Sequence, residues 1–351
     1  MNDYLFPMNK LLVVVSFIAI GILTYFPSSR ITINQNIEPK EEGGPTEELN
    51  PLSIEYMRKQ EYPGSNIVIE QTLPSGTNYD RYITSYKSDG LKIFALLTVP
   101  QGIKPKNGWP VIIFNHGYIP PEQYRTTEKY IAYTDAFSRN GYIVFKSDYR
   151  GHGNSEGKPE GAYYSPAYTI DILNAVSSIK KYPGADPQRI GMWGHSMGGT
   201  ITLRTMVTTP DIKVGVIWAG VVASYEDLAN NWRHPDLNSR AFVPSEREQA
   251  ARRPGRQSFI DKYGSFEQNP SFWQLISPIS YVKDISGPIQ LHHGTEDEEV
   301  PLLFSQKLDE AMKRARKQTE LFTYVGDDHN LANNLSIALQ RSVDFFDKYL
   351  K

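Results

Sequence analysis

The sequence predicts an α/β domain in which helices cover both faces of a mostly parallel central sheet. Beyond Pro110, short apolar runs alternate with amphipathic stretches of helical spacing. Because these runs are apolar along their whole length, they indicate strands buried between two helical layers. The six runs are VIIF at 111, YIVF at 142, RIGMW at 189, VGVIW at 214, IQLH at 289 and LFTYV at 321.

Antiparallel strands are expected to precede this parallel part. The stretch NIVIEQ begins at Asn66, and YITSYKSDGLKIFALLTVP begins at Tyr82. Ser88-Asp89-Gly90 separates two alternating runs, which predicts a β-hairpin turn. Among the stretches between the later strands, the segment from Ala167 to Tyr182 predicts a helix, because its apolar residues recur at helical spacing.

One segment interrupts the alternation of strands and helices. From about residue 225 to about residue 280 the chain is polar, contains tryptophan and is locally basic. This length exceeds an ordinary connection, so we expect a helical cap inserted over the functional site. A solvated face explains its arginines better than recognition of a substrate carboxylate does. These residues are Arg247, Arg252, Arg253 and Arg256.

The amino-terminal sequence bears on localisation. The run Leu11–Phe26 carries no charge, and as a helix it reaches about 24 Å, slightly less than a full bilayer span. This length also fits the core of a secretion signal, although no small-x-small cleavage site follows it. A buried helix is the third interpretation. The prediction is a transmembrane anchor at 11–26 with the catalytic domain outside the cytoplasm, or a secreted or periplasmic enzyme if the segment is a cleaved signal.

The predicted organisation follows from this anchor. Residues 1–10 form an amino-terminal segment, and residues 27–55, rich in Glu, Pro, Asn and Gly, form a flexible tether. Residues 56–351 form the catalytic domain. Lys10 and Arg30 flank the apolar run, so the positive-inside rule hardly distinguishes the two orientations.

Composition excludes several classes of function. The chain has 37 Lys and Arg residues against 39 Asp and Glu residues, so no global positive field exists to hold nucleic acid. Cysteine is absent, which removes disulfides, thiolate nucleophiles and Cys-ligated metals. His292 and His293 are strand neighbours that point to opposite faces, so they cannot readily share one ion. We expect no cofactor and no metal.

The sequence GMWGHSMGG contains the main chemical signal. It places Gly194-His195-Ser196-Met197-Gly198 directly after a predicted strand and before the helix-like stretch TITLRTMV. This is the G-x-S-x-G nucleophile elbow, in which glycines allow a turn sharp enough to expose the serine hydroxyl. The alternative is an incidental Gly-rich helix start. Because the motif stands between strand and helix, Ser196 is the predicted nucleophile.

A serine hydroxyl needs an imidazole to take its proton, and the imidazole needs a carboxylate to fix its tautomer. His329 lies in the loop GDDHN after the last predicted strand, where such a base is expected. His234 falls in the cap, and His292 and His293 end a strand, where packing or a loop contact is expected. His329 is the predicted base.

The acid is not determined by its loop alone. After the run IQLH the sequence offers Glu296, Asp297, Glu298 and Glu299. Asp327 and Asp328 are alternatives, but each would have to fold back onto the imidazole from a tight loop.

Backbone amides are expected to stabilise an oxyanion. Met197 follows the nucleophile at a helix start, where amides lack helical partners. The second donor is expected from Asn115-His116-Gly117-Tyr118, and we predict the amide of Tyr118. A plain strand-to-helix loop is the alternative. The Gly-rich loop 149–155 lacks a phosphate-binding spacing, so a structural role beside the site is expected.

Together these motifs resemble the catalytic domain of the prolyl oligopeptidase family and its relatives among bacterial esterases. The resemblance spans about Ile83 to Lys351 and implies an α/β-hydrolase fold. In that family the pattern G-x-x-D-x-x-V-P marks the acid, which corresponds to Asp297, and the loop of His329 corresponds to that of the base. The motifs are SDGLKIFALLTVP, FNHG, SDYRGHGNSEG, GMWGHSMGG, SPISYVKDISGPIQLHHGTEDEEVP and GDDHN.

The expected activity is cleavage of ester or short-peptide bonds by a serine hydrolase. About 50 residues separate the tether from the hydrolase core, which is too few for the β-propeller that filters peptides in full-length prolyl oligopeptidases. The resemblance therefore does not carry peptide specificity. The alternatives are a carboxylesterase or acyltransferase without peptidase activity, and a catalytically silent membrane-tethered binding module. The expected partners are a small ester or peptide substrate and a membrane, with no nucleic acid.

Overall fold

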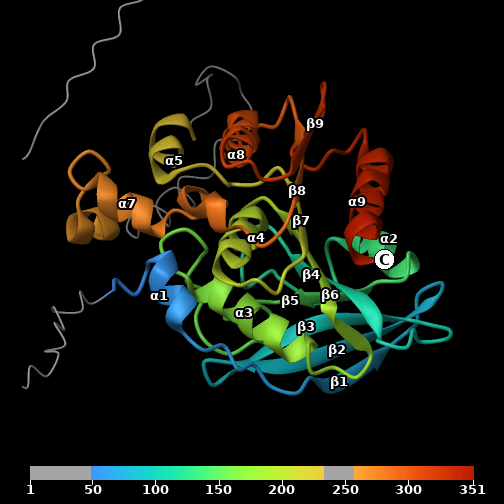
Figure 1. Ribbon diagram of the computed structural model, residues 1–351. Helices are drawn as coiled ribbons and strands as arrows, with labels where there is room; N and C mark the ends of the chain where they lie inside the picture. Colours follow the sequence, from blue (N-terminus) through green and yellow to red (C-terminus); the bar gives the residue numbers. More distant parts are fainter. Residues whose placement is uncertain (1–48, 233–256) are drawn as a thin grey trace, which may run out of the picture. The chain divides into compact units, whose positions relative to one another are not determined.

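The computed structural model describes residues 49–232 and 257–351. In this part of the chain, nine strands form one sheet in the order β1-β2-β3-β5-β4-β6-β7-β8-β9 (Figure 1). Strands β4 to β9 are parallel where they pair, and they correspond to the six predicted apolar runs. The strands are β1 Val68–Leu73, β2 Tyr79–Ser88, β3 Leu91–Pro100, β4 Trp109–Asn115, β5 Ile143–Ser147, β6 Ala185–His195, β7 Val214–Trp218, β8 Ile289–Gly294 and β9 Thr319–Tyr324.

The first three strands form the predicted antiparallel part. Strand β2 pairs with β1 and β3, and β3 joins the parallel part by pairing antiparallel with β5. The turn between β2 and β3 consists of Asp89 and Gly90, whose φ angles of 48° and 78° are the left-handed values that a two-residue hairpin requires. The predicted hairpin at Ser88-Asp89-Gly90 is therefore confirmed.

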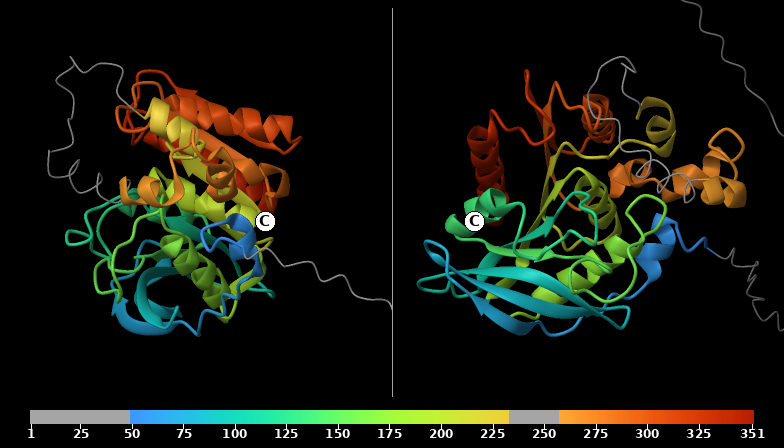
Figure 2. Two further views of the ribbon diagram at one scale, coloured as in Figure 1. Left: turned by 90° about the vertical axis from the view of Figure 1, so that its left-hand side faces the viewer. Right: turned by 180° about the vertical axis from the view of Figure 1, so that it is seen from behind.

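Two helical layers cover the parallel strands. In β4, Val111 and Ile113 face one core while Ile112 and Phe114 face the other, which explains why the strand is apolar throughout. Figure 2 shows α2 and α9 on one side of the sheet and α3 and α4 on the opposite side. The helices are α1 Ile54–Lys59, α2 Ile131–Arg139, α3 Ala167–Ile179, α4 Met197–Thr208, α5 Tyr225–Asn231, α7 Pro270–Ile276, α8 Leu302–Arg314 and α9 Leu335–Leu350, with the 3-10 helix η1 Pro278–Asp284.

A short helix lies at the predicted start of the catalytic domain. Helix α1 crosses the expected boundary between the tether 27–55 and the domain 56–351, and its Ile54 and Met57 are buried. Arg58 donates to the carbonyl of Val207 at the end of α4, at 2.9 Å from Nε. The end of the predicted tether is therefore part of the folded domain.

The described parts of the predicted cap are helical. Helices α5 and α7 and the helical residues 257–263 lie within 225–280, and η1 begins there, while residues 233–256 lie outside the described residues. Side chains explain where two of these helices begin, because Ser224 accepts a hydrogen bond from the amide of Asp227 and Asn269 accepts one from that of Phe272.

In the two described stretches, no helix combines the length and apolar character needed to cross a membrane. The apolar run Leu11–Phe26, on which the predicted anchor depends, lies outside them.

Candidate active site

The turn that carries Ser196 is one residue long. Strand β6 ends at His195 and helix α4 begins at Met197. Ser196 has φ 55° and ψ −118°, a conformation that L residues rarely adopt and that costs on the order of 1–3 kcal/mol. Its amide donates to the carbonyl of Trp218 at 3.0 Å, which ties the turn to the end of β7. The residue is partly exposed, so its side chain is accessible above the sheet.

The glycines around Ser196 are required by close backbone contacts. A Cβ on Gly198 would lie 2.0 Å from the carbonyl oxygen of Asn115 at the end of β4. A Cβ on Gly194 would lie 2.4 Å from the carbonyl oxygen of Gly198. Any side chain at either position would push α4 away from the sheet, so the G-x-S-x-G pattern is explained by packing.

Replacing Gly198 with alanine should therefore destabilise the domain. The clash is with backbone atoms that cannot rotate away, so we expect a loss of about 2–3 kcal/mol in the free energy of unfolding. Gly90→Ala is the control, because nothing lies within 4 Å of its Cβ position and only its positive φ is unfavourable, at about 1 kcal/mol. Guanidinium unfolding should separate the two variants, and equal stability would contradict the packing explanation.

The loops after β8 and β9 are joined by backbone hydrogen bonds. The amide of Thr295 donates to the backbone carbonyl of Tyr324 at 2.9 Å, and the amide of Glu296 donates to the backbone carbonyl of Asp327 at 3.0 Å. Gly294 permits this approach, because its Cβ would lie 2.2 Å from the carbonyl oxygen of Asp327. This pairing brings the two sequence-distant loops into contact.

Asp297 is the acid that reaches the predicted base. Its Oδ2 lies 2.8 Å from Nδ1 of His329, and its side chain is only 1% exposed. Its Oδ1 accepts hydrogen bonds from the amides of Glu299 and Val300, both at 2.9 Å. Asp327 instead accepts from backbone amides of its own loop, including that of Asn334 at 3.0 Å.

The surroundings shift both pKa values. Burial alone would raise the pKa of Asp297, but hydrogen bonds and charge from His293 and His329 outweigh it and hold that pKa well below its usual range. Burial likewise opposes protonation of His329, but the hydrogen bond and charge of Asp297, with the charges of Glu299 and Asp328, raise its pKa. An ionised acid therefore faces a strengthened base.

Glu299 should affect the pH dependence of activity. Its Oε2 lies 3.7 Å from Nε2 of His329, and its side chain is 58% exposed. A base must be neutral to accept a proton, so with His329 as the predicted base we expect activity to fall as the pH drops through its pKa. Because the negative charge of Glu299 raises that pKa, Glu299→Gln should move the acidic limb of kcat/KM to lower pH and leave the high-pH plateau unchanged. A limb that stays in place would show that Glu299 does not act on His329.

His195 connects the base loop to the serine turn. Its Nε2 lies 3.0 Å from the carbonyl oxygen of His329, and its Nδ1 lies 2.8 Å from the hydroxyl of Tyr130. That hydroxyl in turn accepts from the amide of Gly117 at 2.9 Å. Burial and the neighbouring His329 lower the pKa of His195 to about 3, so the ring is neutral and donates through Nε2.

These contacts place His329 beside the serine turn, with the rings of His195 and His329 4.6 Å apart. Within residues 49–232 and 257–351, Ser196 makes no hydrogen bond to His329. Such contacts are often long in a site without substrate and close in the complex. The roles of His195 and Tyr130 were not predicted, because no local sequence pattern indicates contacts between residues so far apart in the chain.

The two predicted oxyanion donors belong to segments close to the serine. Met197 is buried at the first position of α4, where amides have no partner within the helix. The loop 115–118 is also close to the serine, since a Cβ on Gly117 would lie 3.2 Å from Cβ of Ser196. Tyr118 follows Gly117 in this loop and is 51% exposed.

The Gly-rich loop 149–155 packs next to the loop 115–118. The hydroxyl of Tyr149 donates to the carbonyl of His116 at 3.2 Å. Arg150 forms an ion pair with buried Asp171 of α3 at 2.7 Å. These contacts agree with the structural role predicted for this loop.

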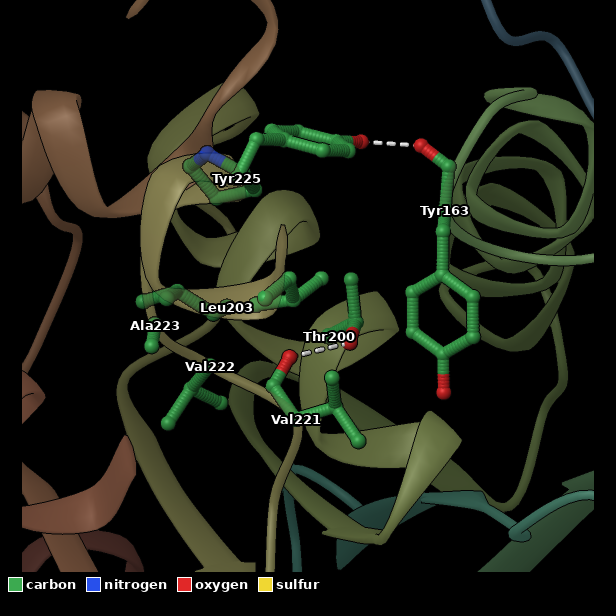
Figure 3. A pocket seen from close by; sticks show the side chains of 9 residues that line it. Tyr163, Thr200, Leu203, Val221, Val222, Ala223 and Tyr225 are labelled. Atoms are coloured by element: carbon green, nitrogen blue, oxygen red, sulfur yellow. Dashed lines mark hydrogen bonds between the residues drawn. The ribbon is translucent and has the colours of Figure 1, made fainter. Parts of the chain in front are cut away.

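An apolar pocket lies alongside α4 (Figure 3). Two hydrogen bonds frame it, one from Thr200 to the carbonyl of Val221 and one from the hydroxyl of Tyr225 to the carbonyl of Tyr163. The amide of Val221 also donates to the carbonyl of Ser196 at 3.2 Å, which joins the pocket wall to the serine turn. The lining residues are Tyr163, Thr200, Leu203, Val221, Val222, Ala223, Tyr225, Leu228 and Pro278.

Two family models match parts of the chain. Residues 109–238, which contain Ser196, match the family described as "Serine aminopeptidase, S33". Residues 257–351, which contain Asp297 and His329, match the "Prolyl oligopeptidase family". The two matches support a prolyl oligopeptidase-family domain in an α/β-hydrolase. Together with the similar peptidases and esterases, they show that the chain is a serine hydrolase.

Individual relatives agree with this assignment. The hydrolase is 24% identical over 263 residues to "Uncharacterized peptidase YtmA" of Bacillus subtilis (strain 168), which covers 74% of this chain and 90% of that protein. Its fold is similar to the acylaminoacyl peptidase of Pyrococcus horikoshii, with a TM-score of 0.61, 22% identity and coverage of 78% and 43% of the two chains. It is also similar to an acetyl xylan esterase from Paenibacillus sp. R4, with a TM-score of 0.62, 16% identity and coverage of 85% and 92%.

The share of each relative that is covered differs widely. The hydrolase spans 34–43% of the length of several other peptidases with which it aligns. The structural similarities show the fold, and both peptidases and esterases share it.

Proposed function

We propose that this hydrolase cleaves ester or short-peptide bonds through an acyl-enzyme. Ser196 acts as nucleophile, His329 as general base and Asp297 as the carboxylate that orients His329. The observation that carries the proposal is the 2.8 Å contact between Asp297 and His329, held beside the strained turn of Ser196. This arrangement matches the roles in a Ser-His-Asp triad.

In the proposed reaction, Ser196 Oγ attacks the carbonyl carbon of the substrate while its proton passes to Nε2 of His329. The carbonyl oxygen becomes an oxyanion that accepts hydrogen bonds from the amides of Met197 and Tyr118. As the intermediate collapses, His329 returns the proton to the leaving alcohol or amine. Water then attacks the acyl-enzyme by the same steps and releases the acid.

The pocket beside the serine turn supports small apolar groups as part of the substrate. Its lining is almost entirely aliphatic and aromatic, and Val221 connects it to the carbonyl of Ser196. The same chemistry serves esters and amides, since both pass through a tetrahedral intermediate. Peptidases and esterases among the similar proteins support both bond types.

A comparison of p-nitrophenyl esters of increasing chain length with peptidyl-proline amides tests the proposal on the full chain. We expect turnover of the short esters, and a ratio of kcat/KM values that assigns the bond preference. Absence of turnover on every ester and amide, with a folded protein by circular dichroism, would overturn the proposal.

We also propose that the apolar run Leu11–Phe26 attaches the hydrolase to a membrane with the catalytic domain outside the cytoplasm. Its support is the absence of charge over this run. Alkaline carbonate extraction of cell membranes should leave an anchored protein in the pellet. Release of the whole chain into the supernatant would contradict an anchor.

A further inference from the structure

We infer that His293 is a positioning residue that holds the carboxylate of Asp297 in place, and that Ser305 fixes the ring of His293 in turn. This inference rests on the proposed function, because it extends the proposed triad by two residues. His293 ends strand β8 and Ser305 lies in the first turn of α8, and both side chains are fully buried.

The neighbours of His293 fix the orientation of its ring. Its Nε2 lies 3.0 Å from Oδ2 of Asp297 and 2.9 Å from the carbonyl oxygen of Val300. Both oxygens only accept, so Nε2 carries a hydrogen. Its Nδ1 lies 2.8 Å from Oγ of Ser305. The contact with Ser305 therefore keeps Nε2 of His293 directed at Asp297.

The same carboxylate oxygen serves both histidines. Oδ2 of Asp297 accepts from Nε2 of His293 and from Nδ1 of His329, while Oδ1 accepts from the amides of Glu299 and Val300. A carboxylate turns readily about its last side-chain bond unless both oxygens are held. His293 therefore holds Oδ2 of Asp297 independently of the proposed base His329.

The adjacent His292 gives an internal comparison. It is also fully buried in β8, but it points to the opposite face of the sheet. Its Nδ1 lies 2.7 Å from the hydroxyl of Tyr324, and its Nε2 lies 2.7 Å from Oε1 of Gln290. The two histidines thus have equal burial and similar numbers of hydrogen bonds, and only His293 contacts Asp297.

Kinetics of His293→Leu, His293→Gln and His292→Leu test the inference on the full chain. We expect His293→Leu to lower kcat about 10- to 100-fold through a misplaced base, with little change in KM. Its acidic limb of kcat/KM should move to higher pH, because a carboxylate with fewer donors holds the imidazolium more tightly. The amide of His293→Gln can still donate to Asp297, so this variant should have a kcat and an acidic limb of kcat/KM close to those of the wild type.

The control His292→Leu should lose stability but keep the wild-type kcat and acidic limb. The charged groups around His329, namely Asp297, Glu299 and Asp328, are the same in all three variants, and His195 stays neutral beside it. If His293→Leu does not fold, Ser305→Ala should give a smaller change of kcat in the same direction. The low-field proton resonance of Nδ1 of His329 gives a second readout that needs no turnover.

Two outcomes separate this inference from the proposed function. In the first outcome, His293→Leu has the kcat, the acidic limb of kcat/KM and the His329 proton resonance of the wild type, while Ser196→Ala is folded but inactive. This outcome would overturn only the role of His293. A folded wild-type protein without turnover would overturn the proposed function, and the resonance of His329 would still report whether His293 affects the carboxylate.

Discussion

Ser196→Ala is expected to abolish ester hydrolysis while the domain remains folded. The substitution removes the proposed nucleophile, and the loss of such a residue from a triad lowers kcat by about 10⁴- to 10⁶-fold. Alanine keeps the Cβ that Ser196 already has, so it adds no contact to the turn. Removal of Oγ breaks no hydrogen bond within residues 49–232 and 257–351. Initial rates on p-nitrophenyl acetate at equal protein concentration measure the effect.

A matched control is Ser75→Ala, because Ser75 is exposed and hydrogen-bonds to Asp80, far from the site in sequence and outside its loops. This variant should keep the wild-type rate. Circular dichroism and thermal unfolding should show that both variants are folded. Hydrolysis by Ser196→Ala at a rate close to that of Ser75→Ala would show that another residue attacks the substrate.

Asp297→Asn is expected to lower kcat by about 10⁴-fold. Each hydrogen bond that this carboxylate makes is one that it accepts, from His293, His329, Glu299 and Val300. An asparagine amide nitrogen would therefore face donors in either orientation. The imidazole of His329 would lose the partner that fixes its tautomer, although the side chain has nearly the same shape.

The control for this prediction is Glu298→Gln, which removes one negative charge from an exposed residue of the same loop. It should leave kcat close to the wild-type value. Comparison of kcat and of the stability of the two variants separates a catalytic effect from a loss of fold. Equal activity of Asp297→Asn and Glu298→Gln would exclude Asp297 as the orienting acid.

Local sequence patterns were sufficient for the sheet and the serine turn. Each apolar run became a strand. A strand buried on both faces is apolar along its whole length, and this pattern can be recognised without knowing which strands pair with it. The turn at Asp89 and Gly90 and the turn at Ser196 were predictable because each depends on the conformational freedom of residues within a few positions. The choice of Asp297 among the acidic residues of its loop was predictable only through the family resemblance.

Contacts between distant residues were not predictable in the same way. Strand alternation indicated that His292 and His293 point apart, but it did not say which of them faces Asp297. The bridge from Gly117 through Tyr130 and His195 joins the loop after β4, the end of β6 and the loop after β9, and no spacing in the sequence encodes it. Helix α1 spans the predicted boundary near residue 55, and sequence patterns did not indicate it because its burial depends on packing against α4 and α7.

The most direct test of the account is to identify the residue that a fluorophosphonate labels in the full-length wild-type chain. Mass spectrometry of the digested adduct should find one modification, on Ser196, and Ser196→Ala should remain unlabelled. Asp297→Asn should be labelled much more slowly than wild type, because activation of the hydroxyl depends on the oriented imidazole. An adduct on a different residue, or equal labelling of wild type and Ser196→Ala, would contradict the assignment of Ser196 as the nucleophile.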